Sequence, residues 1–510
     1  MTGGSKRIKT ALISVYNKER LEEIIKRLND LQILMYSTGG TLDVIVKQGV
    51  QAESIELLTG YPSIFGGRVK TLHPKVFGGI LARRTNVQDS WQLEQYGIPG
   101  FDLIIVDLYP FEETLTMGAT PEEIIEKIDI GGIALIRAAA KNYNDVLIIS
   151  SRNQYDDLIK LLDEKKGESE LEERRRYATK AFCLTSHYDS CIFNYFKLGE
   201  TTVDTFDQTA SSAVSLRYGE NPHQKGTFYG KLEDIFSQLH GKEISYNNLL
   251  DIDAALNLIN DFAEPTYATL KHNNACGCAS DENLAKAWKK TLAGDPISAF
   301  GGIIITNREV DEVCAGEINK LFFEIIIAPA YSDKALELLQ SKKNRIILKI
   351  KNFYCFEKQF RSLLNGVLVQ DKDIVTETIG NLNAVTNAKA SDRELEDLIF
   401  ANKLVKHSKS NAIVLVKNKQ LLASGIGQTS RVDALKQAIE KAKSFGFDLQ
   451  GAVMASEAYF PFPDCVEIAY RAGITAIVQP GGSIKDQESI DYCNANNIAM
   501  VFTGNRHFKH

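Results

Sequence analysis

Residues 1–150 alternate between short apolar runs and amphipathic segments, and this alternation constrains the fold more than any other feature. The apolar runs have the length of strands, and the segments between them place apolar residues at helical spacing. Such alternation is typical of a parallel sheet with helices on both faces. We therefore expect an α/β fold, with strands over 9–15, 32–36, 102–108 and 146–150 and helices over 18–28, 41–48 and 131–141.

A charged, helix-rich stretch over 153–200 and an aperiodic polar stretch over 199–212 follow. We expect the domain boundary there, which gives an amino-terminal domain over 1–200 and a carboxyl-terminal domain over 201–510. Strand and helix patterns alternate again from residue 214 onward. In this part, Lys271-His272 and the helix pattern after it loosely parallel 425–427 and the helix pattern after them, which is compatible with an internal duplication.

Composition disfavours several classes of protein. The net charge of -6 argues against broad nucleic-acid binding, which needs a basic surface. No apolar run approaches the roughly 18 residues of a membrane-spanning helix, so we expect no membrane partner. The eight cysteines include no CxxC pair, so we expect no structural zinc and no disulfide framework. Reduced thiols point to a cytoplasmic protein.

A hydroxyl- and glycine-rich segment over Ser37-Thr38-Gly39-Gly40-Thr41 links a predicted strand to a predicted helix. Glycines let a ligand approach the backbone, and a helix N-terminus favours an anion, so the segment is a candidate phosphate site. Ser14 and Lys18 lie at and just beyond the end of the preceding strand and could reach the same ligand. The alternative is a tight, capped turn without a ligand.

Residues 66–84 carry five Lys or Arg residues, one histidine and four glycines, yet show neither helical nor strand periodicity. Apolar side chains among these charges favour an ordered binding loop, and the alternative is a surface connection. Tyr109 ends a predicted buried strand, and Asp129 precedes a Gly-Gly pair. Lys141 lies twelve residues beyond Asp129. These side chains are candidates for proton transfer.

The dipeptide Lys271-His272 ends an apolar run and is followed by two asparagines. We expect it at the edge of a sheet where α/β proteins bind ligands. A lysine within about 4 Å would disfavour the imidazolium form and keep the imidazole neutral, as a general base requires. The alternative is a solvent-exposed strand end that happens to carry these two residues.

Several further polar motifs occur along the chain, and their order resembles one family: the bifunctional purine-biosynthesis enzymes with AICAR transformylase and IMP cyclohydrolase activity. The motifs are GRVKTLHPK, LYPF, DIGG, RYGENPHQ, SYNN, KHNN, SAFGG, KSNAIV, FPFPD and the terminal RHFKH. The resemblance spans residues 14–510. It implies a methylglyoxal-synthase-like domain, followed by a duplicated cytidine-deaminase-like domain. The deaminase zinc signature is absent from the chain, so the resemblance implies no catalytic metal.

The resemblance implies two reactions. One passes a formyl group from 10-formyltetrahydrofolate to AICAR, and the other closes the product, FAICAR, to IMP with loss of water. For formyl transfer it implies His272 as the proton-transfer group, Lys271 as the residue that tunes it, and Asn411 as an amide that orients the substrate or stabilises the oxyanion. The residues implied to hold the ribotide are Arg217, Tyr218, Asn248, Gly301, Arg431, Arg506 and His510, and those implied to lie toward the folate are Phe462 and Asp464.

For ring closure the resemblance implies proton-transfer and oxyanion roles for Lys70, Tyr109, Asp129 and Lys141. The residues implied to bind the nucleotide are Ser14, Lys18, Ser37, Thr38, Gly39, Arg68 and Thr71. It further implies a homodimer in which the two chains share the transformylase sites. Whether a monovalent cation binds is left open.

Four positions depart from the family pattern, namely Phe77, Asp107, Ala275 and Glu457. Asp107 adds a negative charge near the expected phosphate, and Glu457 replaces an aspartate and puts a cation contact in doubt. Two alternatives remain: an enzyme with a single activity, and a nucleotide-sensing regulatory protein. Neither explains why Lys70, Lys271 and His272 are all retained.

Overall fold

The structure is a computed structural model that describes residues 4–197, 205–210, 212–352 and 357–510. The chain divides into two compact units, unit 1 over Met1–Ser211 and unit 2 over Ser212–His510. The boundary expected at 200/201 lies in 198–204, outside the described residues. None of the helices in the described part is long and apolar enough to cross a membrane.

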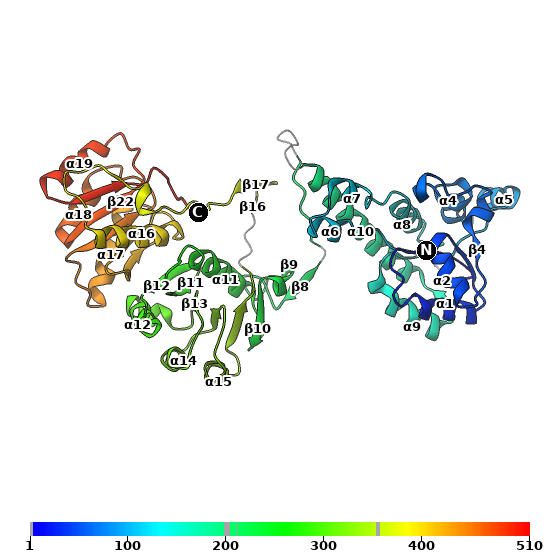
Figure 1. Cartoon of the computed structure of the whole chain (residues 1–510), viewed down its shortest axis with the longest axis horizontal. Helices are drawn as coiled ribbons and strands as arrows, with labels where there is room; N and C mark the ends of the chain where they lie inside the picture. The colour runs from blue at the N-terminus through cyan, green and yellow to red at the C-terminus, as the bar shows by residue number, and fades with distance from the viewer. Residues whose placement is uncertain (1–3, 198–204, 211, 353–356) are drawn as a thin grey trace. The chain divides into compact units, whose positions relative to one another are not determined.

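Unit 1 is built on a five-stranded sheet in the order β4-β3-β2-β5-β6, with every neighbouring pair parallel (Figure 1). Its strands are β2 (Thr10–Ser14), β3 (Leu34–Ser37), β4 (Glu53–Ser54), β5 (Leu103–Val106) and β6 (Leu147–Ile149). A separate antiparallel pair joins β1 (Lys6–Arg7) to β7 (Glu168–Ser169). The parallel α/β architecture expected for this part of the chain is confirmed.

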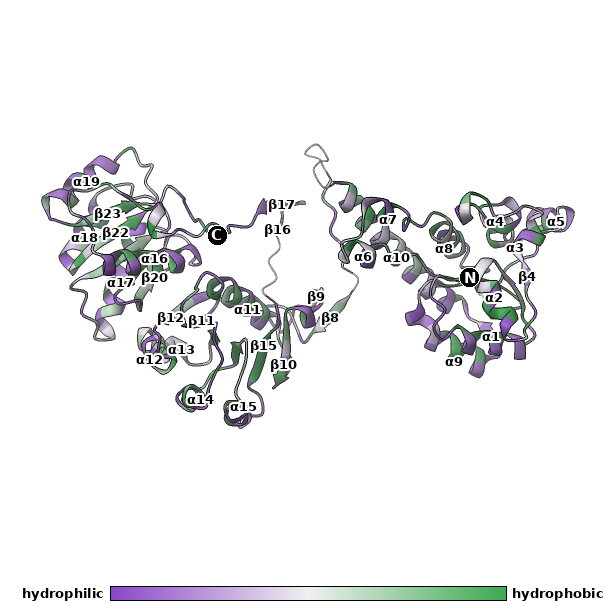
Figure 2. Ribbon diagram, viewed as in Figure 1, coloured by the Kyte–Doolittle hydropathy of each residue, from purple (hydrophilic) through white to green (hydrophobic). Residues whose placement is uncertain are grey.

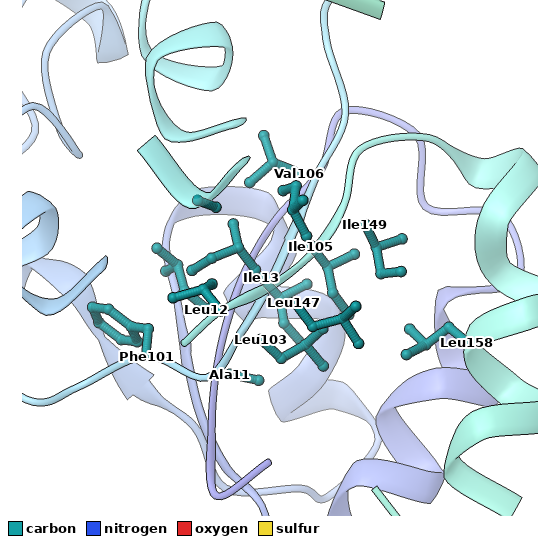
Figure 3. Packing of buried hydrophobic residues seen from close by; sticks show 14 of the residues in the cluster. Ala11, Leu12, Ile13, Phe101, Leu103, Ile105, Val106, Leu147, Ile149 and Leu158 are labelled. Carbon is teal, nitrogen blue, oxygen red and sulfur yellow. The ribbon is translucent and has the colours of Figure 1, made fainter. Parts of the chain in front are cut away.

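The described part of unit 1 also contains ten α-helices. They are α1 (Leu21–Asp30), α2 (Gly39–Lys47), α3 (Ile55–Thr59), α4 (Pro74–Leu81), α5 (Val87–Gln95), α6 (Phe111–Thr116), α7 (Pro121–Ile125), α8 (Gly131–Lys141), α9 (Tyr155–Lys165) and α10 (Leu171–Lys197). Of these, α6 and α7 pack against each other and α6 against α10. All four residues of β5 are buried, as expected for a strand covered on both faces. Figure 3 shows Leu103 and Ile105 of β5 among Leu12 and Ile13 of β2 and Leu147 of β6.

Residues 66–84 were expected to form an ordered binding loop without helical periodicity, and this is wrong for the second half, where α4 runs from Pro74 to Leu81. His73 caps this helix, since its imidazole accepts the Lys75 amide N–H, and proline occupies the first helical position. Val76 and Ile80 are buried one turn apart. Glycines and charged residues interrupt the apolar pattern of this helix, so the sequence shows no clear helical periodicity here.

Unit 2 contains two six-stranded sheets with the same topology, which agrees with an internal duplication. The first has the order β10-β15-β14-β13-β11-β12 and the second β18-β23-β22-β21-β19-β20. In each, three neighbouring strands are parallel and the other pairings are antiparallel. Figure 2 shows strand β15 as hydrophobic, whereas the helices beside the sheets carry both polar and apolar stretches.

The strands of the first sheet are β10 (Phe236–His240), β11 (Thr266–Lys271), β12 (Asn274–Ser280), β13 (Ile303–Thr306), β14 (Ile325–Ala328) and β15 (Ile346–Ile350). Those of the second are β18 (Asn383–Ala384), β19 (Ile413–Val416), β20 (Leu421–Gly425), β21 (Ala452–Ser456), β22 (Ile474–Gln479) and β23 (Ala499–Phe502). Two hairpins lie outside these sheets: β8 (Ala213–Leu216) with β9 (Gly226–Tyr229), and β16 (Lys358–Leu363) with β17 (Gly366–Asp371).

The helices of unit 2 are α11 (Tyr246–Ile259), α12 (Leu284–Gly294), α13 (Pro296–Ala299), α14 (Glu312–Ile318), α15 (Asp333–Gln340), α16 (Asp392–Lys406), α17 (Arg431–Ser444), α18 (Asp464–Ala472) and α19 (Asp486–Ala495). Within the duplication, α12 and α17 occupy equivalent places after the β11–β12 and β19–β20 hairpins. The counterpart of the Lys271–Asn274 turn is therefore the turn over 417–420, and the parallel with 425–427 was out of register.

Candidate functional site

A cavity of about 680 Å³ opens at the carboxyl ends of β2, β3 and β5 in unit 1. This is the edge at which parallel α/β sheets bind ligands, because loops and helix N-termini converge there. Most of the residues implied to act in ring closure line it: Ser14, Lys18, Thr38, Arg68, Lys70, Thr71, Tyr109 and Asp129. Five separate segments of the chain therefore line one space, as a substrate site requires.

One side of this cavity is rich in positive charge. Burial lowers the pKa of the Lys18 ammonium, and the nearby Lys70 acts in the same direction, whereas Asp107 raises it. A Cβ added to Gly39, which begins α2 with φ of 54°, would lie 3.8 Å from Lys70 Nζ. Only glycine adopts this conformation without strain, and its lack of a side chain keeps the lysine close to the helix N-terminus. Lysines beside a helix N-terminus make a site for an anion.

The opposite side carries a buried acid. Burial raises the pKa of Asp129, although the Gly132 N–H donates to its carboxylate at 2.6 Å and Lys70 lies near. Burial also raises the pKa of Tyr109, and the charge of Asp129 adds to this effect. A carboxyl group held above its usual pKa beside a phenol can exchange protons near neutral pH.

Three residues implied for ring closure do not line the cavity directly. The Ser37 hydroxyl is buried and donates to the Ile13 carbonyl at 2.8 Å, so it joins β3 to β2. Gly39 contributes through its backbone. Lys141 is exposed at the carboxyl end of α8, whereas the cavity lies at the amino end of that helix, so its role in proton transfer stays a prediction.

Sequence reasoning missed several residues around this cavity. Tyr16 and Tyr109 pack edge to face with ring centres 5.4 Å apart, and Lys127 Nζ lies 5.3 Å from the Tyr16 ring. The Tyr188 hydroxyl of α10 accepts the Asp129 amide N–H at 2.9 Å and donates to the Lys127 carbonyl at 2.6 Å. No motif marks Tyr188 in the sequence, because it reaches the site from a helix that follows the sheet.

Asp107 has a structural role at the cavity floor. Its carboxylate accepts the backbone N–H groups of Tyr16 and Asn17, and so fixes the turn that carries Lys18. Burial raises the pKa of this carboxyl, and the two amide donors act against the shift. An asparagine oxygen could accept from the same turn, so either side chain can cap it.

In unit 2, Lys271 and His272 belong to a tight hairpin between β11 and β12. His272 and Asn273 have φ of 52° and 66°, and Lys271 pairs with Asn274, as in a type I′ turn. Leu270 pairs with Ile303 at the start of β13. The turn therefore lies at the amino ends of the parallel strands, and the expectation of a ligand edge at their carboxyl ends is wrong for this sheet.

The polar surroundings of this turn differ from the expected lysine–histidine pair. Lys271 Nζ donates to the Phe300 carbonyl at 3.0 Å, next to Gly301. The backbone N–H of Asn273 donates to Asp251 Oδ1 at 2.6 Å. Burial raises the pKa of the Asp251 carboxyl, whereas this hydrogen bond and His272 lower it. The sequence motif did not reveal this carboxylate beside the histidine.

The second sheet of unit 2 places its candidate residues at the carboxyl ends of β21, β22 and β23. Arg431 Nη1 donates to Glu457 at 2.7 Å and Nη2 to Asn411 Oδ1 at 2.7 Å. Asn411 Nδ2 donates to the Gln428 carbonyl at 3.0 Å. Arg431 and Glu457 are 7% and 0% exposed, so this is a buried ion pair that orients the asparagine. Arg431 is thus occupied with protein groups.

The two candidate segments of unit 2 are connected by a hydrogen bond. The Lys409 amide donates to Asn274 Oδ1 at 3.2 Å, which brings the Lys271–Asn274 turn against the segment that leads to Asn411. Ser410 exchanges hydrogen bonds with Lys509, so the carboxyl-terminal residues reach the same place. Residues that are far apart in the sequence therefore meet at one face of unit 2.

The remaining candidates of unit 2 vary in their surroundings. Asn248 is buried and donates to Glu324 at 3.1 Å. Gly301 has φ of 72°, which favours glycine. Phe462 is exposed beneath the Lys485 ammonium, and Asp464 begins α18. Four others stand on the surface or near it, and no ligand role is evident from their contacts: Arg217, Tyr218, Arg506 and His510.

His507, absent from the expected site, anchors the carboxyl-terminal segment. Its ring contacts Asp373 at 2.6 Å and Glu377 at 3.2 Å, and its backbone N–H donates to the Glu457 carbonyl at 3.0 Å. Burial lowers the pKa of His507, but the two carboxylates outweigh it and raise the pKa to about 9. The segment carrying Arg506 and His510 is thereby tied to the Glu457–Arg431 pair.

Comparison with known proteins covers nearly the whole chain. A family model described as AICARFT/IMPCHase bienzyme matches residues 139–441, and one described as an MGS-like domain matches residues 20–134. A Bacteroides thetaiotaomicron protein named "Bifunctional purine biosynthesis protein PurH" is 63% identical over 506 residues, covering 99% of each chain. Proteins of the same name from Aquifex aeolicus and Persephonella marina are 47% and 46% identical, over 98% of this chain and 100% and 99% of theirs.

Proposed function

Because the chain belongs to the family of bifunctional purine-biosynthesis enzymes, we propose that each of its two units carries one of the family's two reactions. The chain transfers a formyl group from a folate donor to AICAR and closes the formamido product to IMP with loss of water. Unit 1 is the ring-closing unit and unit 2 the formyl-transferring unit. The observation that carries this assignment is the cavity of unit 1, where the cations and the buried acid implied for ring closure meet.

In ring closure, the carboxamide nitrogen attacks the formyl carbon of the same molecule, so positioning alone can lower much of the barrier. Lys18, Arg68 and the N-terminus of α2 bind the phosphate. Lys70 stabilises the oxyanion that develops on the formyl oxygen. Burial raises the pKa of Asp129, and Tyr109 lies beside it. The Asp129 carboxyl group transfers the proton between the attacking nitrogen and the departing oxygen.

The test replaces one buried carboxylate at a time in the same cavity. Asp129→Asn should lower kcat for closure of supplied FAICAR by roughly 10²–10⁴, the usual contribution of a positioned acid or base. Asp107→Asn is the matched control, because it makes the same chemical change but can still cap the Tyr16 turn. Equal losses in the two variants would show that Asp129 has no special part in the chemistry.

For formyl transfer, we propose that unit 2 uses 10-formyltetrahydrofolate as its donor. The AICAR amine is conjugated and therefore a poor nucleophile, so it needs a base as it attacks. His272 removes the proton, and Lys271 adjusts its surroundings. Asn411 has one N–H engaged by the Gln428 carbonyl, which leaves the second to donate to the oxyanion of the tetrahedral intermediate. Phe462 and Asp464 contact the folate.

His272→Ala should lower formyl transfer at least 10²-fold without affecting closure of supplied FAICAR. His240→Ala in the same unit is the control, because that ring contacts only the Lys342 carbonyl among the hydrogen bonds of the described residues. A comparable loss in the control would point to a general effect of removing an imidazole from unit 2.

We propose that two copies of the chain form a homodimer that completes the formyl-transfer sites. Two features support this: His272 is exposed in a single chain, and the β16–β17 hairpin is exposed along both strands. Leu364 and Leu368 of this hairpin are 100% and 61% exposed, which is unusual for two leucines of one hairpin unless a partner covers them.

Leu368→Glu should shift the mass measured by light scattering from two copies to one. The same variant should lose formyl transfer and keep ring closure, because the cavity of unit 1 lies in one chain. A dimer that persists with full formyl transfer would contradict the proposed interface.

A monovalent cation near Glu457 is a further part of this proposal. Glu457 Oε1 is buried, and in the described part of the chain it has no hydrogen-bond partner. A weakly hydrated cation could satisfy it, since buried carboxylate oxygens need a partner. Formyl transfer measured in potassium chloride should exceed that in tetramethylammonium chloride at equal ionic strength, and equal rates would contradict the cation's involvement.

A further inference from the structure

Three side chains of the classes that bind transition metals converge in unit 1, away from the cavity. Glu112 lies on α6, and His187 and Cys191 lie four residues apart on α10, where they face the same side. Their ligand atoms all lie within 4.8 Å of one another. Neither residue of α10 belongs to a motif of the two reactions, so this cluster has no part in the proposed chemistry.

Two of the three spacings in this cluster are close to those in a tetrahedral metal site. His187 Nε2 lies 3.3 Å from Glu112 Oε2 and 3.7 Å from Cys191 Sγ. Zinc bonds of about 2.0 Å to nitrogen or oxygen and about 2.3 Å to sulfur, at tetrahedral angles, separate neighbouring ligands by about 3.3–3.6 Å. The imidazole nitrogen therefore lies from both other ligand atoms at nearly the distances that a shared ion would set.

The surroundings orient the imidazole for this purpose. His187 Nδ1 lies 2.7 Å from the Thr209 hydroxyl, and a proton on Nδ1 leaves the Nε2 lone pair facing Cys191 and Glu112. Such an outer hydrogen bond is typical of histidines that bind metal.

The cluster rests on packed helices. Phe111 begins α6 and meets Tyr188 and Tyr195 of α10 with ring centres 6.1 and 5.9 Å apart. These contacts hold Glu112 beside His187 and Cys191, although the Glu112 side chain itself is 64% exposed. The pre-formed helix pair leaves little ordering to be done when an ion binds.

We propose that Glu112, His187 and Cys191 bind a divalent transition-metal ion of the zinc class, which fastens α6 to α10. Nitrogen, sulfur and oxygen donors in a tetrahedral arrangement favour zinc over magnesium or calcium. Since α6 begins two residues after Tyr109, the ion would steady the segment that leads into the cavity. The site is structural and supplies no step of ring closure. The expectation of no structural zinc rested on the absence of CxxC pairs, and a site assembled from two helices needs no such pair.

The test uses Co²⁺ and Zn²⁺ alone as probes of the full chain. Cobalt bound by a thiolate shows a charge-transfer absorption, and titration should reach one equivalent per chain and be reversed by zinc. Cys191→Ser and His187→Gln should lose this absorption, and Glu112→Gln should weaken binding at least tenfold. Cys183→Ser is the matched control, because it removes an exposed cysteine of the same helix.

Circular dichroism of each variant establishes that α10 is folded. Glu112→Gln changes an exposed side chain, so it gives a result even if the variants at the partly buried His187 and Cys191 unfold. Absence of the absorption in the wild-type chain would overturn the proposal. So would its persistence in Cys191→Ser or its loss in Cys183→Ser, since either would assign the ion to another thiol.

Discussion

The buried ion pair between Arg431 and Glu457 leads to a quantitative prediction about unit 2. Glu457→Gln keeps the shape of the side chain but removes its charge, which leaves a guanidinium that is 7% exposed without its carboxylate. Breaking a buried pair from one side costs about 3–5 kcal/mol, because the remaining charge stays desolvated. Arg431 keeps neutral acceptors in Asn411 and the Ser456 hydroxyl, so we expect the lower end, about 3 kcal/mol.

The assay is urea unfolding followed by the fluorescence of Trp288, which is buried in unit 2. The second tryptophan, Trp91, is exposed in unit 1, and Trp91→Phe confines the signal to unit 2. This matters because two units need not unfold in a single transition. Glu396→Gln is the control, since it breaks an exposed pair with Lys419 of the kind that contributes less than about 1 kcal/mol.

A loss of less than about 1 kcal/mol in Glu457→Gln, equal to that of the control, would refute this reasoning. It would mean that the guanidinium is satisfied by its neutral partners or reaches solvent once the carboxylate has gone. The pair would then have no special role in holding Asn411.

Three further predictions concern single positions. Wild-type unit 2 should lose stability as pH rises from about 6.5 to 9. Two carboxylates outweigh burial and raise the pKa of His507 from 6.5 to about 9. The stabilisation that they give is therefore complete below pH 6.5 and is lost as pH rises through 9. His507→Gln should flatten this slope in urea titrations, and an unchanged slope would contradict it. Gly425→Ala should destabilise the protein by about 1–3 kcal/mol, because the added methyl group would overlap the backbone of α17. Gly316→Ala in α14, where the methyl group meets open space, should stabilise it by about 0.5–1 kcal/mol. Thermal melts that reverse this order would refute the packing argument. Tyr188→Phe leaves the Asp129 amide unpaired at a cost of about 1–3 kcal/mol, and should lower kcat for ring closure while formyl transfer is unchanged.

The sheet of unit 1 could be predicted because each of its main strands and helices is marked by the residues of that element alone. Apolar runs mark β2 and β5, apolar residues at helical spacing mark α8, and α8 begins and ends at the expected residues 131 and 141. In the sequence, Thr120 and Glu123 have the spacing of a capping box, and the structure contains this box at the start of α7. Helix α4 was not predictable in this way, because its buried face is short and its glycines and charges hide the period.

The tertiary partners of the candidate site could not be read from the sequence. Asp251 faces the His272 turn from α11, and Tyr188 reaches Asp129 from α10, and neither stands in a motif. Lys271-His272 had the composition of a strand end at a ligand edge, yet it closes a hairpin at the amino ends of the parallel strands. Composition identifies polar side chains, but strand direction decides which edge they occupy.

The central claim is that one chain carries two separate reactions, and complementation between two variants tests it most directly. His272→Ala and Asp129→Asn are each incubated with AICAR and 10-formyltetrahydrofolate, alone and mixed, and products are identified by mass spectrometry. We predict that His272→Ala leaves AICAR unchanged, that Asp129→Asn accumulates FAICAR, and that the mixture forms IMP. A mixture that forms no IMP, or a His272→Ala enzyme that fails to close supplied FAICAR, would contradict the assignment of one reaction to each unit.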